Sequence, residues 1–260
     1  MNIYLYDKTF DGLLSVIFCS LKTGIEPDLI IGSLEYQSAL FANTYEIETN
    51  HENADKIWNA FEQKTSYIES KTLFYVYLSE MNDIEMLIYR YMKYVFSKES
   101  SVTRNYREMC VLEIRNIRRK VLHEAHRMIS FVRFQKTKEL IYFALIDPMY
   151  DVLKIIGKHF ERRFANQKWI IYDTKRKYGL YYDGKELQEI KFSDIQFKTD
   201  GTPLVEEQKS EYDTLIEKSW KQYYQSINIK ERKNTKMHLR LLPKRYWKYL
   251  PEKNVLDEDL

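Results

Sequence analysis

Apolar residues recur at two spacings along the chain, and the spacing predicts which segments are strands and which are helices. Residues 2–6 alternate as a strand does, whereas the apolar positions from Phe10 to Leu21 follow a helical spacing that Gly24 ends. Apolar side chains in steps of three and four predict another helix over residues 80–97. The first hundred residues are therefore predicted to be mostly helical and to open with one strand.

The second half of the chain is predicted to hold a sheet between helices. Helical spacing covers about residues 104–126, 150–163 and 205–227. Runs rich in β-branched and aromatic residues predict five strands, at 128–134, 140–146, 169–172, 178–182 and 186–192. Asp183-Gly184 predicts a type I′ hairpin turn between the last two. This order of hairpin, helix and three-stranded meander predicts an α+β fold with a five-stranded, mainly antiparallel sheet backed by helices.

Charge divides the chain into two parts of opposite sign. Residues 1–100 hold 8 Lys and Arg against 15 Asp and Glu, and residues 101–250 hold 32 against 19. We expect an acidic part at 1–100 and a basic part at 101–260, which ends in a basic, aromatic tail. Only a few residues join the helices on either side of this boundary, so the two parts are predicted to pack as one unit. The asymmetry favours a polyanionic partner for the basic part, although two opposite surfaces could also neutralise each other across a contact.

Several classes of protein are disfavoured by what the sequence lacks. No apolar run reaches the roughly 18–20 residues of a membrane span, and the first residues do not resemble a signal peptide, so we expect a cytoplasmic protein without a membrane. The two cysteines form no C-x-x-C pair, and His123-Glu-Ala-His126 is one residue short of the zinc-protease motif. We expect no metal and no other cofactor, and we expect Glu124 to pair with a nearby arginine. Glycine-rich phosphate loops and the hydrolase nucleophile elbow are also missing.

Cations cluster together with aromatic residues, as they do in nucleic-acid-binding proteins. They lie on one face of the helix at 104–126, in the turn at 175–177, and in the tail at 228–249. The expected nucleic-acid-binding residues are Arg115, Arg118, Arg119, Arg133, Lys175, Arg176, Lys177, Arg232, Lys244, Arg245, Tyr246 and Trp247. We expect the turn and Arg245–Lys248 to share one face, with Tyr246 or Trp247 free to stack on a base. Alternatively, these cations form ordinary solvated surfaces, and the tail wraps over the domain with its aromatic rings inward.

Five strings of the sequence carry a family resemblance: Tyr6–Leu14, Glu124–Phe134, His159–Phe164, Ile171–Gly184 and Arg245–Glu252. Together they resemble an uncharacterised bacterial family described as probable DNA metabolism proteins. The resemblance implies a DNA-repair setting, because relatives occur beside a radical-SAM protein thought to act in DNA modification or repair. In some relatives a similar domain follows a uracil-DNA-glycosylase-like domain. The resemblance supplies no agreed catalytic residues, and this chain lacks the cysteine trio of a radical-SAM enzyme and the water-activating motif of the glycosylase.

Three hypotheses follow. The leading one is a DNA-binding accessory module that works with a radical-SAM partner on single-stranded or damaged DNA, with the acidic part contacting a partner protein. The second is an enzyme that acts on nucleic acid or nucleotides through a polar cluster near strand or helix ends: Glu124, His126, Arg127, Asp147, His159 and Asp173. The third is a purely structural partner protein. A deep pocket lined by the polar cluster would favour the enzyme, and a flat basic face with exposed aromatic rings would favour the binding module.

Overall fold

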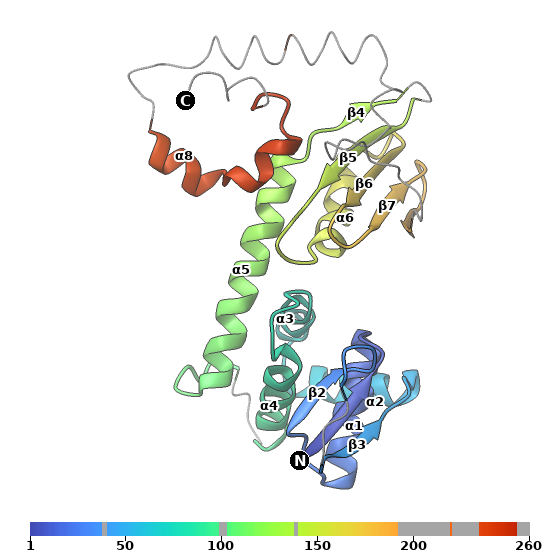
Figure 1. The fold of residues 1–260 in the computed structure, drawn as a ribbon, viewed down its shortest axis with the longest axis vertical. Helices are drawn as coiled ribbons and strands as arrows, with labels where there is room; N and C mark the ends of the chain where they lie inside the picture. The colour runs from blue at the N-terminus through green and yellow to red at the C-terminus, as the bar shows by residue number, and fades with distance from the viewer. Residues whose placement is uncertain (38–40, 99–102, 138–139, 192–218, 220–233, 254–260) are drawn as a thin grey trace. The chain divides into compact units, whose positions relative to one another are not determined.

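The computed structural model of the protein describes residues 1–37, 41–98, 103–137, 140–191, 219 and 234–253 (Figure 1). The chain forms two compact units, Met1–Leu122 and His123–Leu260, and its fold is α+β, as predicted. The boundary expected at 100/101 lies outside the described residues, and the packing of the two parts as one unit stays a prediction. Within the described residues, no helix has the length and apolarity needed to span a membrane.

In its described residues, the first unit contains a three-stranded parallel sheet and four helices before α5. β1 (Asn2–Tyr6) is the central strand, flanked by β2 (Leu29–Gly32) and β3 (Asn43–Glu46). The Thr9 hydroxyl caps the first helix, which ends at Gly24 with a φ of 72°. The helices are α1 (Phe10–Thr23), α2 (His51–Lys64), α3 (Tyr67–Tyr77) and α4 (Ile84–Phe96). The first strand, α1 and α4 were predicted, but β2 and β3 were not.

The long helix α5 (Met109–Phe131) crosses the division between the two units. It starts and ends about five residues later than predicted, so the prediction of a strand at 128–134 is wrong. Val121, Ala125 and Met128 are buried at helical spacing, and they continue the apolar face that begins earlier in the helix. Only β4 (Gln135–Lys136) remains of that predicted strand.

The second unit is built on a five-stranded sheet in the order β4-β5-β6-β7-β8. Its other strands are β5 (Tyr142–Ile146), β6 (Trp169–Asp173), β7 (Tyr178–Tyr182) and β8 (Leu187–Ile190). Three of the four pairings are antiparallel, as predicted, whereas β5 and β6 are parallel and are joined through α6 (Leu153–Arg163). A Cβ atom on Gly157 of α6 would lie 2.6 Å from the Leu180 side chain, so this helix packs closely on the sheet.

The turn between β7 and β8 is not the predicted type I′ turn. Of Asp183 and Gly184 only the glycine has a positive φ, at 100°, whereas a type I′ turn needs two. The Asp183 carboxylate instead accepts hydrogen bonds from the backbone N–H groups of Lys185 and Glu186. Beyond the sheet, the described chain ends with α8 (Thr235–Leu241) and the 3-10 helix η3 (Lys244–Tyr249). The helix predicted at 205–227 lies outside the described residues except for Ser219.

Candidate nucleic-acid interface

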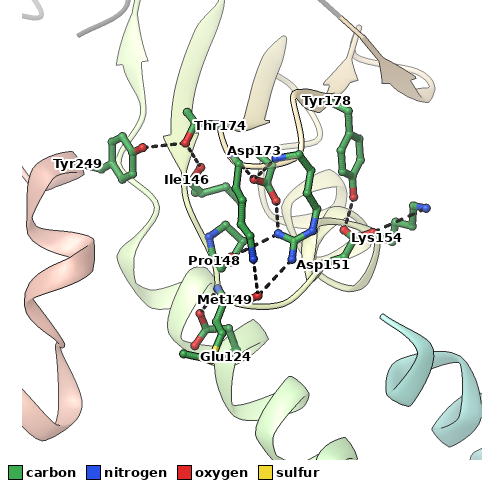
Figure 2. Close-up of polar contacts among 12 residues, drawn as sticks. Glu124, Ile146, Pro148, Met149, Asp151, Lys154, Asp173, Thr174, Tyr178 and Tyr249 are labelled. Carbon is green, nitrogen blue, oxygen red and sulfur yellow. Dashed lines mark hydrogen bonds and ion pairs between the residues drawn. The ribbon is translucent and has the colours of Figure 1, made fainter. Parts of the chain in front are cut away.

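The parallel pair β5–β6 gives the second unit an edge where polar groups converge. Ile146 is aligned with Asp173, so both strands end at this edge and the loops that follow them are neighbours. In open α/β sheets, ligands bind outside the carboxyl ends of parallel strands. We call this region the β5–β6 edge and define it by four parts: Glu124 of α5, the loop 147–151, the turn 173–177 and the helix η3. Figure 2 shows how the first three parts converge and how Tyr249 of η3 reaches Thr174.

Glu124 is the central carboxylate of the β5–β6 edge. Its side chain is 2% exposed, and Oε1 accepts a hydrogen bond from the backbone N–H of Met149 at 2.8 Å. Oε2 accepts from the Tyr246 hydroxyl at 2.6 Å and from Nη2 of Arg245 at 3.1 Å, and Nη1 of Arg127 lies 3.7 Å away. Burial and the bond to Glu124 raise the pKa of Tyr246, so its hydroxyl remains a donor. The predicted pairing of Glu124 with an arginine is confirmed, and the carboxylate links α5 to both the loop and η3.

Asp173 organises the turn after β6. It is fully buried and accepts hydrogen bonds from Nη1 of Arg176 at 2.8 Å and from the backbone N–H groups of Lys175 and Arg176. Burial raises the pKa of Asp173, and the ion pair with Arg176 opposes this shift. The same guanidinium donates to the carbonyl oxygens of Pro148 and Met149, at 3.3 and 3.2 Å. Arg176 therefore joins the turn to the loop 147–151, and its side chain is only 9% exposed.

The remaining acids around the edge are also engaged. Oδ2 of Asp147 lies 2.6 Å from Nζ of Lys248, and Asp151 accepts a hydrogen bond from the Tyr178 hydroxyl and an ion pair from Lys154 at 3.8 Å. These carboxylates hold segments of the second unit together: Asp147 joins the loop 147–151 to η3, and Asp151 joins the same loop to β7. Sequence reasoning missed Asp151 and its bond to Tyr178, because nothing in one sequence relates residues 27 positions apart.

The residues of the enzyme hypothesis converge only in part. Glu124, Arg127, Asp147 and Asp173 lie around the loop 147–151, as Figure 2 shows for two of them. His126 is exposed on α5, and His159 of α6 contacts the ring of Phe160 edge-on. In the part of the chain that the structure describes, no contact joins either histidine to that group, and no cluster of three or more His, Cys, Asp or Glu residues could hold a metal ion.

The candidate nucleic-acid-binding residues fall into three groups. Those with exposed positions are Arg115, Arg119, Lys175, Lys177, Lys244 and Arg245, of which Arg245 is also paired with Glu124. Those held in internal contacts are Arg133, which pairs with Glu252 at 2.8 Å, Arg176 and Tyr246. Arg118 and Trp247 are half-buried, and Arg232 lies outside the described residues.

The turn and η3 lie side by side, as expected. The hydroxyl groups of Thr174 and Tyr249 are 2.9 Å apart, and Nζ of Lys175 donates to the carbonyl oxygen of Met149. Tyr246, however, is only 3% exposed, so its ring is not free to stack on a base. This part of the tail wraps inward, as the alternative interpretation held, while Lys244 stays exposed.

Trp247 makes contacts of its own. Its indole N–H donates to the carbonyl oxygen of Leu242 at 3.1 Å, and its ring stacks on His238 with the centroids 5.9 Å apart. Nζ of Lys253 lies 5.0 Å from the centre of the same ring. The predicted stacking of Trp247 on a base stays a prediction.

Residues 82–252 match the sequence model of DUF4130, a domain of unknown function. The match covers more than half of the chain. This chain belongs to the DUF4130 family. The matched DUF4130 span contains the whole β5–β6 edge and ends at Glu252, the ion-pair partner of Arg133. No curated protein matches the chain. Membership of an uncharacterised family agrees with the resemblance, and the DNA-repair setting stays a prediction.

Proposed function

We propose that this DUF4130 protein is a DNA-binding accessory module of DNA metabolism or repair, which works with a radical-SAM DNA-modification protein. The sequence resemblance supports the biological setting. The β5–β6 edge would meet the DNA, and its exposed cations Lys175, Lys177 and Lys244 would contact phosphates.

An excess of cations in the second unit carries this proposal. Residues 123–260 hold 27 Lys and Arg against 21 Asp and Glu. At the β5–β6 edge the carboxylates of Glu124, Asp147 and Asp173 are already matched by cations within the protein. The cations in excess are therefore available to a polyanion, and their binding to phosphates would release the counterions that both sides hold in solution.

The state of the acids favours a binding module over an enzyme. A general acid or base must lie within hydrogen-bond reach of the proton that it transfers, so a buried carboxylate already bonded inside the protein is a weaker candidate. Both oxygens of Glu124 accept hydrogen bonds inside the protein, and both oxygens of Asp173 do so as well. Lys177, in contrast, is exposed and adopts a φ of 58°, a conformation that costs a lysine on the order of 1 kcal/mol or more. Such strain often marks functional positions, which supports a role for the turn.

The proposal is tested by the salt dependence of DNA binding in a triple variant, Lys175→Gln, Lys177→Gln and Lys244→Gln. The slope of log K against log salt is negative. Removal of each phosphate contact should reduce its magnitude by about 0.9 on duplex DNA and by about 0.7 on a single strand. For the triple variant we expect the magnitude of the slope on duplex DNA to decrease by up to about 2.7, whatever the DNA sequence. Arg176 is left in place, because its loss would leave buried Asp173 without a cation.

A matched control removes the same charge from the first unit, with Lys22→Gln, Lys56→Gln and Lys71→Gln. These three lysines are exposed on α1, α2 and α3. If both triple variants bind DNA with the wild-type slope, the β5–β6 edge is not the DNA site. If both weaken equally, only net charge matters and the edge has no special role.

A further inference from the structure

All the exposed residues of α6 are cations. Of its eleven residues four are exposed, and all four are basic: Lys154, Lys158, Arg162 and Arg163. The only acid in the helix, Glu161, is half-buried.

Three of these cations form a row along the helix. Lys154, Lys158 and Arg162 are spaced four residues apart, so they follow one face of the helix at intervals of about 6 Å. The opposite face is fixed on the sheet, where Leu153, Ile156, Gly157 and Phe160 are buried. Because that packing prevents rotation of the helix, the cation line must face outward.

An unrelieved line of like charges is unfavourable, since cations four apart on a helix repel each other. Lys154 is partly compensated by Asp151, at 3.8 Å. Among the described residues, neither Lys158 nor Arg162 forms an ion pair; the Arg162 guanidinium donates only to the Lys158 carbonyl oxygen. The contrast is α2, whose exposed face mixes signs and pairs Lys56 with Glu52 at 3.9 Å.

We propose that the α6 cation line, defined as Lys154, Lys158 and Arg162, is a second contact for the phosphate backbone of nucleic acid. The inference rests on the proposed function and extends it. Asp151 belongs to the loop 147–151, and Figure 2 shows Lys154 beside it, so the line begins at the β5–β6 edge. From there it runs for about 12 Å along the helix. A nucleic-acid strand that binds at the β5–β6 edge then continues over α6. The bound stretch of nucleic acid is therefore longer than the β5–β6 edge alone would hold.

The test is the double variant Lys158→Gln and Arg162→Gln, with Lys22→Gln and Lys56→Gln as the charge-matched control. Lys154 is left in place because its ammonium group lies 5.8 Å from the centre of the Tyr178 ring. Glutamine keeps the helix propensity, so the melting temperature should not fall. The variant can no longer bind two of the phosphates. We therefore expect the magnitude of the salt slope on duplex DNA to decrease by about 1.8, which corresponds to a loss of affinity of about 60-fold at 0.1 M salt. The control should bind as the wild type does.

Failure of this inference is distinguishable from failure of the proposed function. If the edge variant loses affinity and the α6 variant does not, the cation line is not a DNA contact and the proposed function stands. If wild-type protein binds no DNA at low salt, both fail. Polyglutamate serves as a probe for an acidic protein partner. If the α6 variant loses binding to polyglutamate but keeps its DNA affinity, the line belongs to a protein interface and the inference is wrong.

Discussion

Replacement of Glu124 by alanine should destabilise the second unit more than any surface change. The buried carboxylate accepts hydrogen bonds from Met149 N, the Tyr246 hydroxyl and Arg245, so its loss leaves three donors without their acceptor. Removing one partner of a buried ion pair costs about 3–5 kcal/mol. Because the Arg245 side chain is 39% exposed and can regain water, we take the lower end, about 3 kcal/mol. For a chain of this length that corresponds to a fall in melting temperature of about 6–12 °C.

The assay is a thermal melt together with hydrogen exchange over η3, which Glu124 holds through Arg245 and Tyr246. Glu113→Ala is the control, since Glu113 is an exposed acid on the same helix and its loss should change stability by no more than about 0.5 kcal/mol. If Glu124→Ala melts within about 2 °C of the control, or if η3 exchanges at the wild-type rate, the carboxylate does not hold these segments together.

Two further predictions concern stability. Burial and the nearby Lys253 lower the pKa of His238, so the unfolded chain takes up this proton first as the pH falls below about 6.5. The contribution of neutral His238 to the free energy of unfolding is therefore complete above that pH and is lost as the pH falls below it. Between about pH 7.5 and 5.5 the wild type should lose more stability than His238→Gln does. An equal loss in the two proteins would refute this prediction. In the first unit, a Cβ atom on Gly12 would lie 2.2 Å from Oδ1 of Asp7 and 2.8 Å from Oγ1 of Thr49. Gly12→Ala should lower the free energy of unfolding by about 1–3 kcal/mol in denaturant melts. An unchanged midpoint would show that Asp7 and Thr49 can move aside at no cost.

Local signals predicted the elements that local contacts determine. α1 was predictable because Thr9 caps its start and Gly24 ends it. β2 was missed because its four residues carry no alternation, and it forms only by parallel pairing with β1, which is distant in sequence. Residues 128–131 have the composition of a strand, but Met128 extends the buried stripe of α5, and helix packing outweighed strand propensity there.

The candidate site was predictable in its residues but hardly in its pairs. Glu124 was expected to pair with an arginine, but the sequence did not indicate which arginine. The sequence indicated Glu124, Asp173, Arg176 and Arg245 as chemically important, yet it assigned the acids to one hypothesis and the cations to another. The structure pairs them: Glu124 and Arg245 are 121 positions apart, and no local pattern relates residues at such a distance. The pairing of Asp173 with Arg176 spans a single turn and was in principle accessible, because a buried acid after a strand needs a nearby donor.

The central claim, that this DUF4130 protein binds DNA through its basic second unit, is tested most directly by a salt titration of DNA binding with the full chain. Fluorescent single-stranded and duplex DNA of mixed sequence serve as probes. If about five phosphates are contacted, log K should fall with log salt at a slope of about −3.5 on the single strand and about −4.5 on the duplex. A slope near zero, or no binding at low salt, would contradict the claim.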